Sequence, residues 1–250
     1  MSDRSDFRAQ PWRADLGRSV RLFREFLAEQ SDPVRFYGAL AEDSVAQLET
    51  YGRLVGALVL DVGAGPGHFR DAFERAGATY VCLDTDTGEL TQRGEDTART
   101  LVGDGMNLPV AEGSVDVCFS SDVLEHVRDP WRMADEILRV TKPGGLAFVS
   151  YTVWLGPWGG HETSPWHYLG GRRARQRFRR RHGHEPKNRY GETMFAVSVR
   201  AGLGWAERQT AADVLAVVPR YHPRWTHWLT RVPVLRELVT WNLVMVLRKR

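Results

Sequence analysis

The stretch LVLDVGAGPGHF, residues 58–69, decides the fold of this chain. Its first five residues are apolar except for Asp61, which is typical of a strand buried on both faces. Glycines follow at 63, 65 and 67, where a tight turn needs residues without a side chain. A dinucleotide-binding turn would carry its third glycine at the position of His68. The pattern therefore predicts a strand, a glycine loop and a helix that hold a different cofactor.

The composition indicates one α/β domain with an elaboration. The chain has 250 residues, with 42% hydrophobic and 26% charged side chains, which is ordinary for a globular protein. This length is near the upper limit for one hydrophobic core. The N-terminal residues show no secretory signal, and no later run is long and apolar enough to span a bilayer. We therefore expect a cytoplasmic protein.

Strand-like and helical patterns alternate along the chain, which predicts a parallel sheet covered on both faces. Two helices are expected within residues 16–52, broken at Asp32 and Pro33. An apolar run at 212–218 is expected to pair antiparallel with the final run, WNLVMVLRK. The remaining expected strands cover 57–62, 79–84, 100–103, 115–120 and 145–153, and the remaining helices cover 67–76, a short stretch near 88, 130–140, 192–202 and 223–239, the last broken by Pro233.

Further motifs follow the glycine loop in a fixed order. Asp84 ends the second strand and Asp104 ends the third. FSSDVLEHVRDP covers residues 119–130, and KPGG covers residues 142–145 before the fifth strand. This series, from 57 to 153, resembles the class I S-adenosylmethionine-dependent methyltransferases, most closely the bacterial type 11 group.

The resemblance implies a Rossmann-like, doubly wound α/β fold with seven strands, mostly parallel, and an antiparallel last strand. Residues 1–250 would form one methyltransferase domain. Within it, 1–56 would form an N-terminal helical lid and 57–154 the cofactor-binding core. Residues 155–191 would form a substrate-side insertion after the fifth strand, and 192–250 the C-terminal part of the sheet.

The resemblance also implies S-adenosylmethionine as the cofactor and assigns residues to it. Asp84 would accept the ribose hydroxyls, Asp104 would bind the adenine amino group, and Met106 would pack near the ring. Asp61 would order the loop and the cofactor's amino group, and Tyr37 resembles a lid tyrosine or packs between helices. The complete expected set is Tyr37, Asp61, Gly63, Ala64, Gly65, Gly67, Asp84, Thr85, Asp104, Gly105, Met106 and Ser121.

The acceptor is expected above the carboxyl ends of the fourth and fifth strands, because ligands of open α/β sheets bind there. His161 and His167 are the candidate general bases, and pocket lining is the alternative role. His161, Glu162 and His167 fit no zinc spacing, so we expect no metal. The expected acceptor-side residues are Ser121, Asp122, His126, Trp154, Trp158, His161, Glu162, Trp166, His167 and Tyr168.

Residues 172–189, RRARQRFRRRHGHEPKNR, concentrate positive charge in a chain whose net charge is only +3. Such a run attracts phosphate, an anionic lipid head group or nucleic acid, or forms a solvated helix face. With the nearby tryptophans, it suggests a small, hydrophobic or lipid-like acceptor and contact with a membrane surface.

Other functions remain open at this stage. An RNA or protein methyltransferase would use the basic run, but the chain lacks an NPPY-type tetrapeptide after the fourth strand, so nucleic acid is not the expected partner. A non-catalytic S-adenosylmethionine-binding protein is a further alternative. A dehydrogenase is disfavoured by His68. Cys82 and Cys118 lie in strand-like runs and are expected to be reduced, buried thiols.

Overall fold

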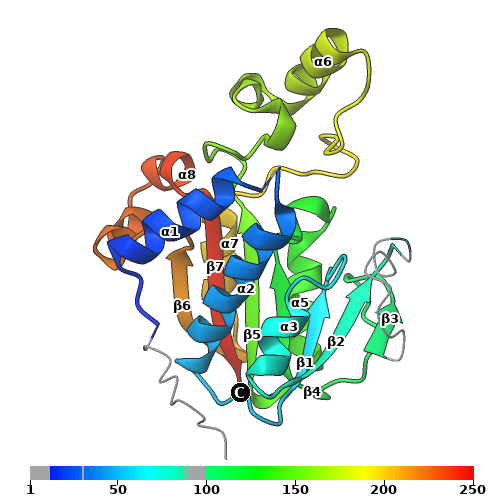
Figure 1. The fold of residues 1–250 in the computed structure, drawn as a ribbon, viewed down its shortest axis with the longest axis vertical. Coiled ribbons are helices and arrows are strands. Elements are labelled where there is room, and N and C mark those ends of the chain that lie inside the picture. Colours follow the sequence, from blue (N-terminus) through cyan, green and yellow to red (C-terminus); the bar gives the residue numbers. More distant parts are fainter. Residues whose placement is uncertain (1–11, 30, 87, 89–98) are drawn as a thin grey trace, which may run out of the picture.

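The computed structural model describes residues 12–29, 31–86, 88 and 99–250. Its centre is a seven-stranded sheet with the order β3-β2-β1-β4-β5-β7-β6, in which β7 runs antiparallel to both of its neighbours (Figure 1). The strands are β1 (Leu58–Val62), β2 (Thr79–Asp84), β3 (Thr100–Val102), β4 (Val115–Ser121), β5 (Thr141–Thr152), β6 (Ala212–Pro219) and β7 (Asn242–Lys249). The expected doubly wound sheet with an antiparallel last strand is confirmed.

Helices cover both faces of this sheet. The α-helices are α1 (Leu16–Leu27), α2 (Pro33–Glu49), α3 (Arg70–Arg75), α5 (Pro130–Val140), α6 (Gly171–His182), α7 (Val199–Glu207) and α8 (Leu235–Val239). The 3-10 helices are η2 (Leu124–His126), η3 (His161–Thr163), η4 (Trp166–Leu169) and η5 (Arg224–Arg231). No helix in the described part of the chain has both the length and the apolar character needed to cross a membrane.

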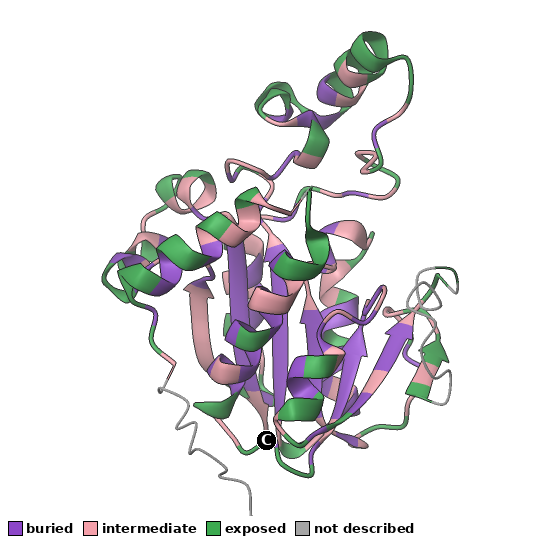
Figure 2. Ribbon diagram, in the orientation of Figure 1, coloured by how far each residue is buried: buried purple, intermediate pink, exposed green. Residues whose placement is uncertain are grey.

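The alternation of side chains along each strand builds two separate cores. On one face, Phe119 and Phe148 pack with Phe73 of α3 and with residues of α1 and α2. On the other face, Cys118 packs with Ile137 of α5 and Trp205 of α7. Figure 2 shows the central strands buried between these layers. Cys82 and Cys118 lie in opposite cores, and both are buried free thiols, as expected.

The first two helices lie where the sequence predicts them, because both begin with clear capping residues. Asp15 accepts a hydrogen bond from the backbone N–H of Arg18 at 2.7 Å and begins α1. Asp32 accepts one from the backbone N–H of Arg35 at 3.1 Å, and Pro33 is the first residue of α2. These caps confirm the expected break between the two helices.

Three expected elements differ from the structure. The helix expected at 192–202 is α7 at Val199–Glu207, because Gly191 has a φ of +84° and Ser198 caps the helix. β5 begins at Thr141, so KPGG lies inside it and not before it. The insertion expected at 155–191 contains a helix that no expected element covered, because α6 buries only Gly171 and Ala174 and therefore shows no apolar periodicity. The short helix expected near 88 lies outside the described residues, apart from Gly88.

Arg220, directly after β6, joins the two N-terminal helices to the sheet. Its guanidinium is fully buried and donates to Ser121 Oγ, Ser150 Oγ and Asp122 Oδ2 at 2.8, 3.0 and 3.1 Å, and to Ser44 Oγ of α2 at 2.6 Å. Its carbonyl accepts a hydrogen bond from Arg18 of α1 at 2.8 Å. One side chain therefore contacts α2, β5 and the end of β4.

We expect Arg220→Met to lower the free energy of unfolding by about 3–5 kcal/mol, because it leaves Asp122 and three hydroxyls without their buried partner. Urea unfolding measures this loss. Arg250→Met is the matched control, since Arg250 forms an exposed ion pair with Asp213 and such pairs contribute at most about 1 kcal/mol. Equal small losses in both variants would contradict the prediction.

Candidate active site

The glycine loop follows β1 at the carboxyl edge of the sheet. Gly63, Gly65 and Gly67 have φ angles of +79°, +51° and +74°, in the left-handed region that favours glycine. A side chain at Gly63 would also lie 2.5 Å from Val123. The sequence pattern thus reflects both backbone conformation and close packing against the segment after β4.

The acidic residues at the ends of β2 and β3 lie beside this loop or face the same edge. Asp84 Oδ2 accepts a hydrogen bond from the backbone N–H of Gly65 at 2.9 Å, and Oδ1 accepts one from Asp86 at 3.1 Å. The exposed Asp104 accepts one from the backbone N–H of Met106 at 2.8 Å. Each carboxylate retains lone pairs for hydroxyl or amino groups of a ligand. The chemistry and orientation of these residues fit S-adenosylmethionine.

The remaining expected cofactor residues occupy the same edge. Ala64 is buried within the loop, and Thr85 is exposed directly after β2. Gly105 lies between Asp104 and Met106, where a side chain would meet Met133 Sδ at 3.0 Å. Ser121, at the end of β4, donates to Asp122 Oδ2 at 2.9 Å. Their contact with the cofactor stays a prediction.

Tyr37 of α2 reaches the glycine loop, as the resemblance implied for a lid tyrosine. Its ring stacks on His68 with a centroid distance of 4.9 Å and an interplanar angle of 7°. Its hydroxyl donates to Glu29 Oε1 at 3.2 Å. Burial raises the pKa of Tyr37, so its hydroxyl stays protonated at neutral pH. Helix α2 therefore contacts the glycine loop through this stacked pair.

Asp61 is a buried carboxyl group next to the loop, with 2% of its surface exposed. Burial raises its pKa to about 7, Asp84 adds to the rise, and the hydrogen bond from the Tyr80 hydroxyl opposes it. The group is thus about half ionised at neutral pH. A nearby cation would favour its charged form.

The tryptophans of the insertion and of the C-terminal part of the chain divide into two sets. Trp158 and Trp241 contact each other at 4.1 Å, and Phe26 of α1 contacts Trp158 at 5.1 Å. Trp154 packs on Tyr190 at 4.8 Å inside the insertion. Trp166, Trp225 and Trp228 are instead 43%, 71% and 56% exposed. In the first set, Trp158 joins the insertion to α1, and the second set lies at the surface.

The two candidate bases have different surroundings. His167 is buried, with Nε2 3.2 Å from the carbonyl oxygen of Gly156 and its ring against Trp154 at 5.4 Å. Burial lowers its pKa. These contacts favour pocket lining for His167. His161 lies instead beside the segment that follows β4, and its catalytic role stays a prediction.

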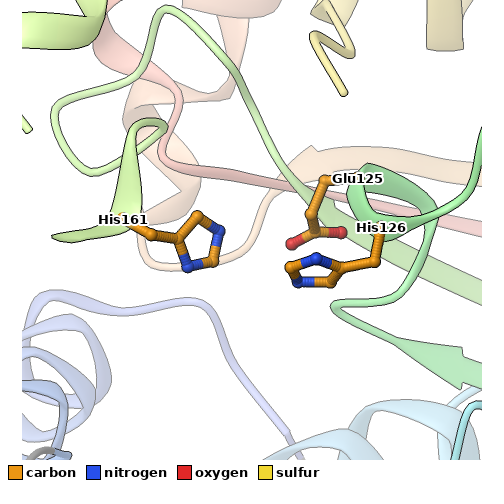
Figure 3. Close-up of side chains that lie close together, drawn as sticks. All are labelled: Glu125, His126 and His161. Atoms are coloured by element: carbon orange, nitrogen blue, oxygen red, sulfur yellow. The ribbon is translucent and has the colours of Figure 1, made fainter. Parts of the chain in front are cut away.

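His161 forms a compact cluster with Glu125 and His126, whose side chains turn toward one another in Figure 3. One donor atom from each residue lies within 4.8 Å of the other two. The two imidazole rings meet edge to face at 5.4 Å. Burial and the neighbouring His126 lower the pKa of His161 to about 4, so its imidazole is neutral at pH 7. His161 therefore meets Glu125 and His126 in the described part of the chain, and not Glu162 and His167, the trio for which the sequence predicts no metal.

Sequence reasoning missed two functional candidates. Glu125 was not singled out, although it precedes His126 directly after β4. Arg220 was also missed, although a charged residue at the end of the apolar run ADVLAVVP was a usable signal. Both lie at the carboxyl edge of the sheet.

Comparison with known proteins identifies the class of this chain. Residues 60–149 match a family model described as a methyltransferase domain. A protein of Mycobacterium sp. strain KMS named "Uncharacterized methyltransferase" is 54% identical over 244 residues, covering 94% of this chain and 96% of that protein. A protein of the same name from Mycobacteroides abscessus is 51% identical and is covered completely.

Solved structures agree at the level of the fold. A S-adenosylmethionine-dependent methyltransferase from Mesorhizobium loti is 19% identical, with a TM-score of 0.58, over 84% of this chain and 98% of the other. One from Aquifex aeolicus is 14% identical, with a TM-score of 0.54, over 93% and 98%. This chain belongs to the S-adenosylmethionine-dependent methyltransferases. It is an enzyme, and S-adenosylmethionine is its cofactor.

The pKa of Asp61 predicts pH-dependent cofactor binding. A cationic cofactor with its amino group near Asp61 binds best when the Asp61 carboxyl group is ionised. Below pH 7 this group is mostly protonated, so it must release its proton when the cofactor binds, which weakens binding. We expect the affinity for S-adenosylmethionine to rise up to about 50-fold between pH 5 and pH 7 and then level off. Calorimetric titration across this range measures it.

Asp61→Asn should bind more weakly at pH 7 and lose this dependence. Asp213→Asn, which removes an exposed acid at the start of β6, should keep it. The same pH slope in Asp61→Asn as in the wild type would contradict the assignment.

Proposed function

We propose that this enzyme transfers the methyl group of S-adenosylmethionine to an oxygen, nitrogen or carbon atom of a small, hydrophobic or lipid-like acceptor. Bound S-adenosylmethionine supplies a methyl group on a sulfonium, and transfer is an in-line displacement at that carbon. The protein must then hold the acceptor in line and keep water away. Many such reactions require positioning more than a strong base.

The observation that supports an apolar acceptor is an aromatic cluster contributed by four segments. Phe23 and Phe26 come from α1, Trp158 from the insertion, Tyr221 from the segment after β6, and Trp241 from the residue before β7. Their ring centroids lie 4.1 to 6.3 Å apart. Aromatic rings provide large apolar surfaces for a ligand. An acceptor held between lid and insertion would lie against them.

A partition experiment tests the acceptor class. The enzyme is incubated with S-adenosylmethionine labelled at the methyl group and a mycobacterial extract, chosen because the relatives come from mycobacteria. We expect the label in the organic phase after solvent extraction. Label confined to precipitated protein, RNA or the aqueous phase would contradict a lipid-like acceptor.

Asp84→Ala is the negative control, because it removes the carboxylate that faces the glycine loop. We expect it to weaken cofactor binding at least about tenfold, as loss of a charged hydrogen bond would. Asp213→Ala, far from the loop, should transfer label as the wild type does.

Helix α6 supports a contact between the enzyme and an anionic surface. The helix carries seven arginines in GRRARQRFRRRH. Among the described residues, Arg175 pairs with Glu185 and Glu192, and Arg179 lies 3.5 Å from Glu185. No described carboxylate pairs with Arg177, Arg180 or Arg181. Several positive charges are therefore uncompensated.

An apolar surface accompanies these charges. A groove of about 620 Å³ lies along α6 and is lined by Trp166, Leu169 and arginines. The Arg177 guanidinium lies 3.8 Å from the centre of the Trp166 ring, and Leu169 is 62% exposed. Figure 1 shows α6 projecting away from the sheet. Exposed tryptophan and leucine beside arginines suit the interface of an anionic membrane.

We expect binding to phosphatidylglycerol vesicles to weaken by up to about 1000-fold when alanine replaces Arg177, Arg179, Arg180 and Arg181. Each arginine near an anionic membrane surface contributes about 1 kcal/mol to the binding free energy, and four of them are removed. Co-sedimentation with vesicles measures it. A charge-matched control replaces the exposed Arg53, Arg75, Arg99 and Arg208 instead. Unchanged vesicle binding and turnover in the α6 variant would refute the membrane contact.

A further inference from the structure

We propose that Glu125, His126 and His161 bind one divalent transition-metal ion of the zinc class. The two histidines and one carboxylate come from two separate segments, η2 after β4 and η3 in the insertion. The fold therefore brings a metal-binding donor set together across 36 residues of sequence.

The carboxylate of Glu125 is oriented and incompletely partnered. Only 2% of Glu125 is exposed, and its Oε1 accepts a hydrogen bond from the backbone N–H of Thr152 at 2.9 Å. Its Oε2 is buried and has no hydrogen-bond partner among the described residues. A buried carboxylate oxygen without a partner is unfavourable unless a cation or donor compensates it. A bound cation would supply that compensation.

His126 is fixed in the tautomer that metal binding requires. Its Nδ1 lies 2.8 Å from the carbonyl oxygen of Thr193, which can only accept, so Nδ1 carries the proton. Nε2 then presents a lone pair. Metal-bound histidines almost always donate their other N–H to a carbonyl or carboxylate in this manner. The backbone of Glu125 is held in addition by the N–H of Phe195 at 2.7 Å.

His161 completes the donor set from the other side. Its Nε2 is buried and has no hydrogen-bond partner in the described part of the chain. The three donor atoms, which lie within 4.8 Å of one another, would need to approach to about 3.0–3.4 Å around an ion with bonds of about 2.1 Å.

The charges that act on the cluster are of both signs, because Asp122 is itself paired with the Arg220 guanidinium at 3.1 Å. Asp122 acts electrostatically on both Glu125 and His161, and Glu162 acts on His161. Lys187 opposes them at His161, with a smaller effect than either carboxylate. Two imidazoles with one carboxylate suit Zn²⁺, Fe²⁺ or Co²⁺ better than Mg²⁺ or Ca²⁺, which prefer oxygen donors.

Three protein donors leave at least one coordination position open. An acceptor hydroxyl bound there would lose its proton to solvent more readily, because the ion lowers its pKa. Its oxygen would then form the new C–O bond while the S–C bond breaks and its electron pair stays on sulfur, giving S-adenosylhomocysteine. This role rests on the proposed function and narrows the acceptor to a hydroxyl compound, whereas the metal site itself does not depend on it.

Metal binding is tested without acceptor or cofactor. The full-length protein is treated with EDTA, desalted and titrated with Zn²⁺ and Co²⁺ by calorimetry, with Mg²⁺ as the comparison. We expect one ion per chain with micromolar or tighter affinity for Zn²⁺, a visible absorption band for Co²⁺, and no comparable binding of Mg²⁺.

His126→Gln and His161→Asn each remove a proposed metal ligand and should weaken Zn²⁺ binding at least about 100-fold. Even the loss of a residue that only hydrogen-bonds to a metal ligand weakens metal binding about 10- to 100-fold. Asparagine suits position 161, where φ is +47°. Glu207→Gln and His184→Asn are the controls, an exposed carboxylate at the end of α7 and a surface histidine beside His182, and should bind as the wild type does.

Titration of the same variants with S-adenosylmethionine reports their folding and separates the two proposals. Two results would overturn the metal site, provided that cofactor binding persists. The first is that the wild type binds no Zn²⁺, or binds it with a dissociation constant above about 1 mM. The second is that His126→Gln and His161→Asn bind Zn²⁺ as the wild type does. If EDTA does not change the transfer of label into the organic phase, the ion has no role in methyl transfer. If no label reaches the organic phase although Zn²⁺ binds, only the proposed acceptor class is contradicted.

Discussion

The buried guanidinium of Arg220 is the interaction on which the arrangement of the site depends. It lies where β6 ends and holds Ser121 and Asp122 at the end of β4, Ser150 of β5 and Ser44 of α2. Its carbonyl accepts from Arg18, which itself pairs with Asp43 at 2.6 Å in a buried contact. Because a buried charge is stable only with its partners, the lid helices and the sheet edge must keep this geometry together.

The two halves of the sheet, on either side of β4, carry different functional groups at this edge. The half of the sheet with β1, β2 and β3 contributes the glycine loop and the carboxylates Asp61, Asp84 and Asp104, which suit a cationic cofactor with a ribose. The half with β5, β7 and β6 contributes Tyr221 and Trp241 of the aromatic cluster, and Thr152 at the end of β5. The segment directly after β4 supplies Asp122, Glu125 and His126 between them. Cofactor, acceptor and ion would thus meet at one strand end.

The insertion after β5 extends this edge in two directions. Toward the sheet, it contributes Trp158 to the aromatic cluster and His161 to the donor set. Away from the sheet, it carries α6, most of which is exposed (Figure 2). All of its arginines except the half-buried Arg175 are exposed. Arg175 and its pairs with Glu185 and Glu192 tie that helix to the segment that returns to the domain. One insertion could therefore link binding of an anionic surface to the position of the acceptor.

The sequence by itself determined the class of fold, the cofactor and the residues predicted to bind it. These residues can be recognised from local sequence patterns: glycines at 63, 65 and 67, and an acid at the end of successive strands. Parallel strands bring their carboxyl ends to one edge of the sheet, so these residues are expected to lie together. The tertiary structure alone decided which side chains gather beyond the end of β4. Glu125 and His126 meet His161, and Arg220 meets Asp122, across 36 and 98 residues respectively. Those contacts depend on the path of an insertion without apolar periodicity and on strand order, neither of which a local pattern records.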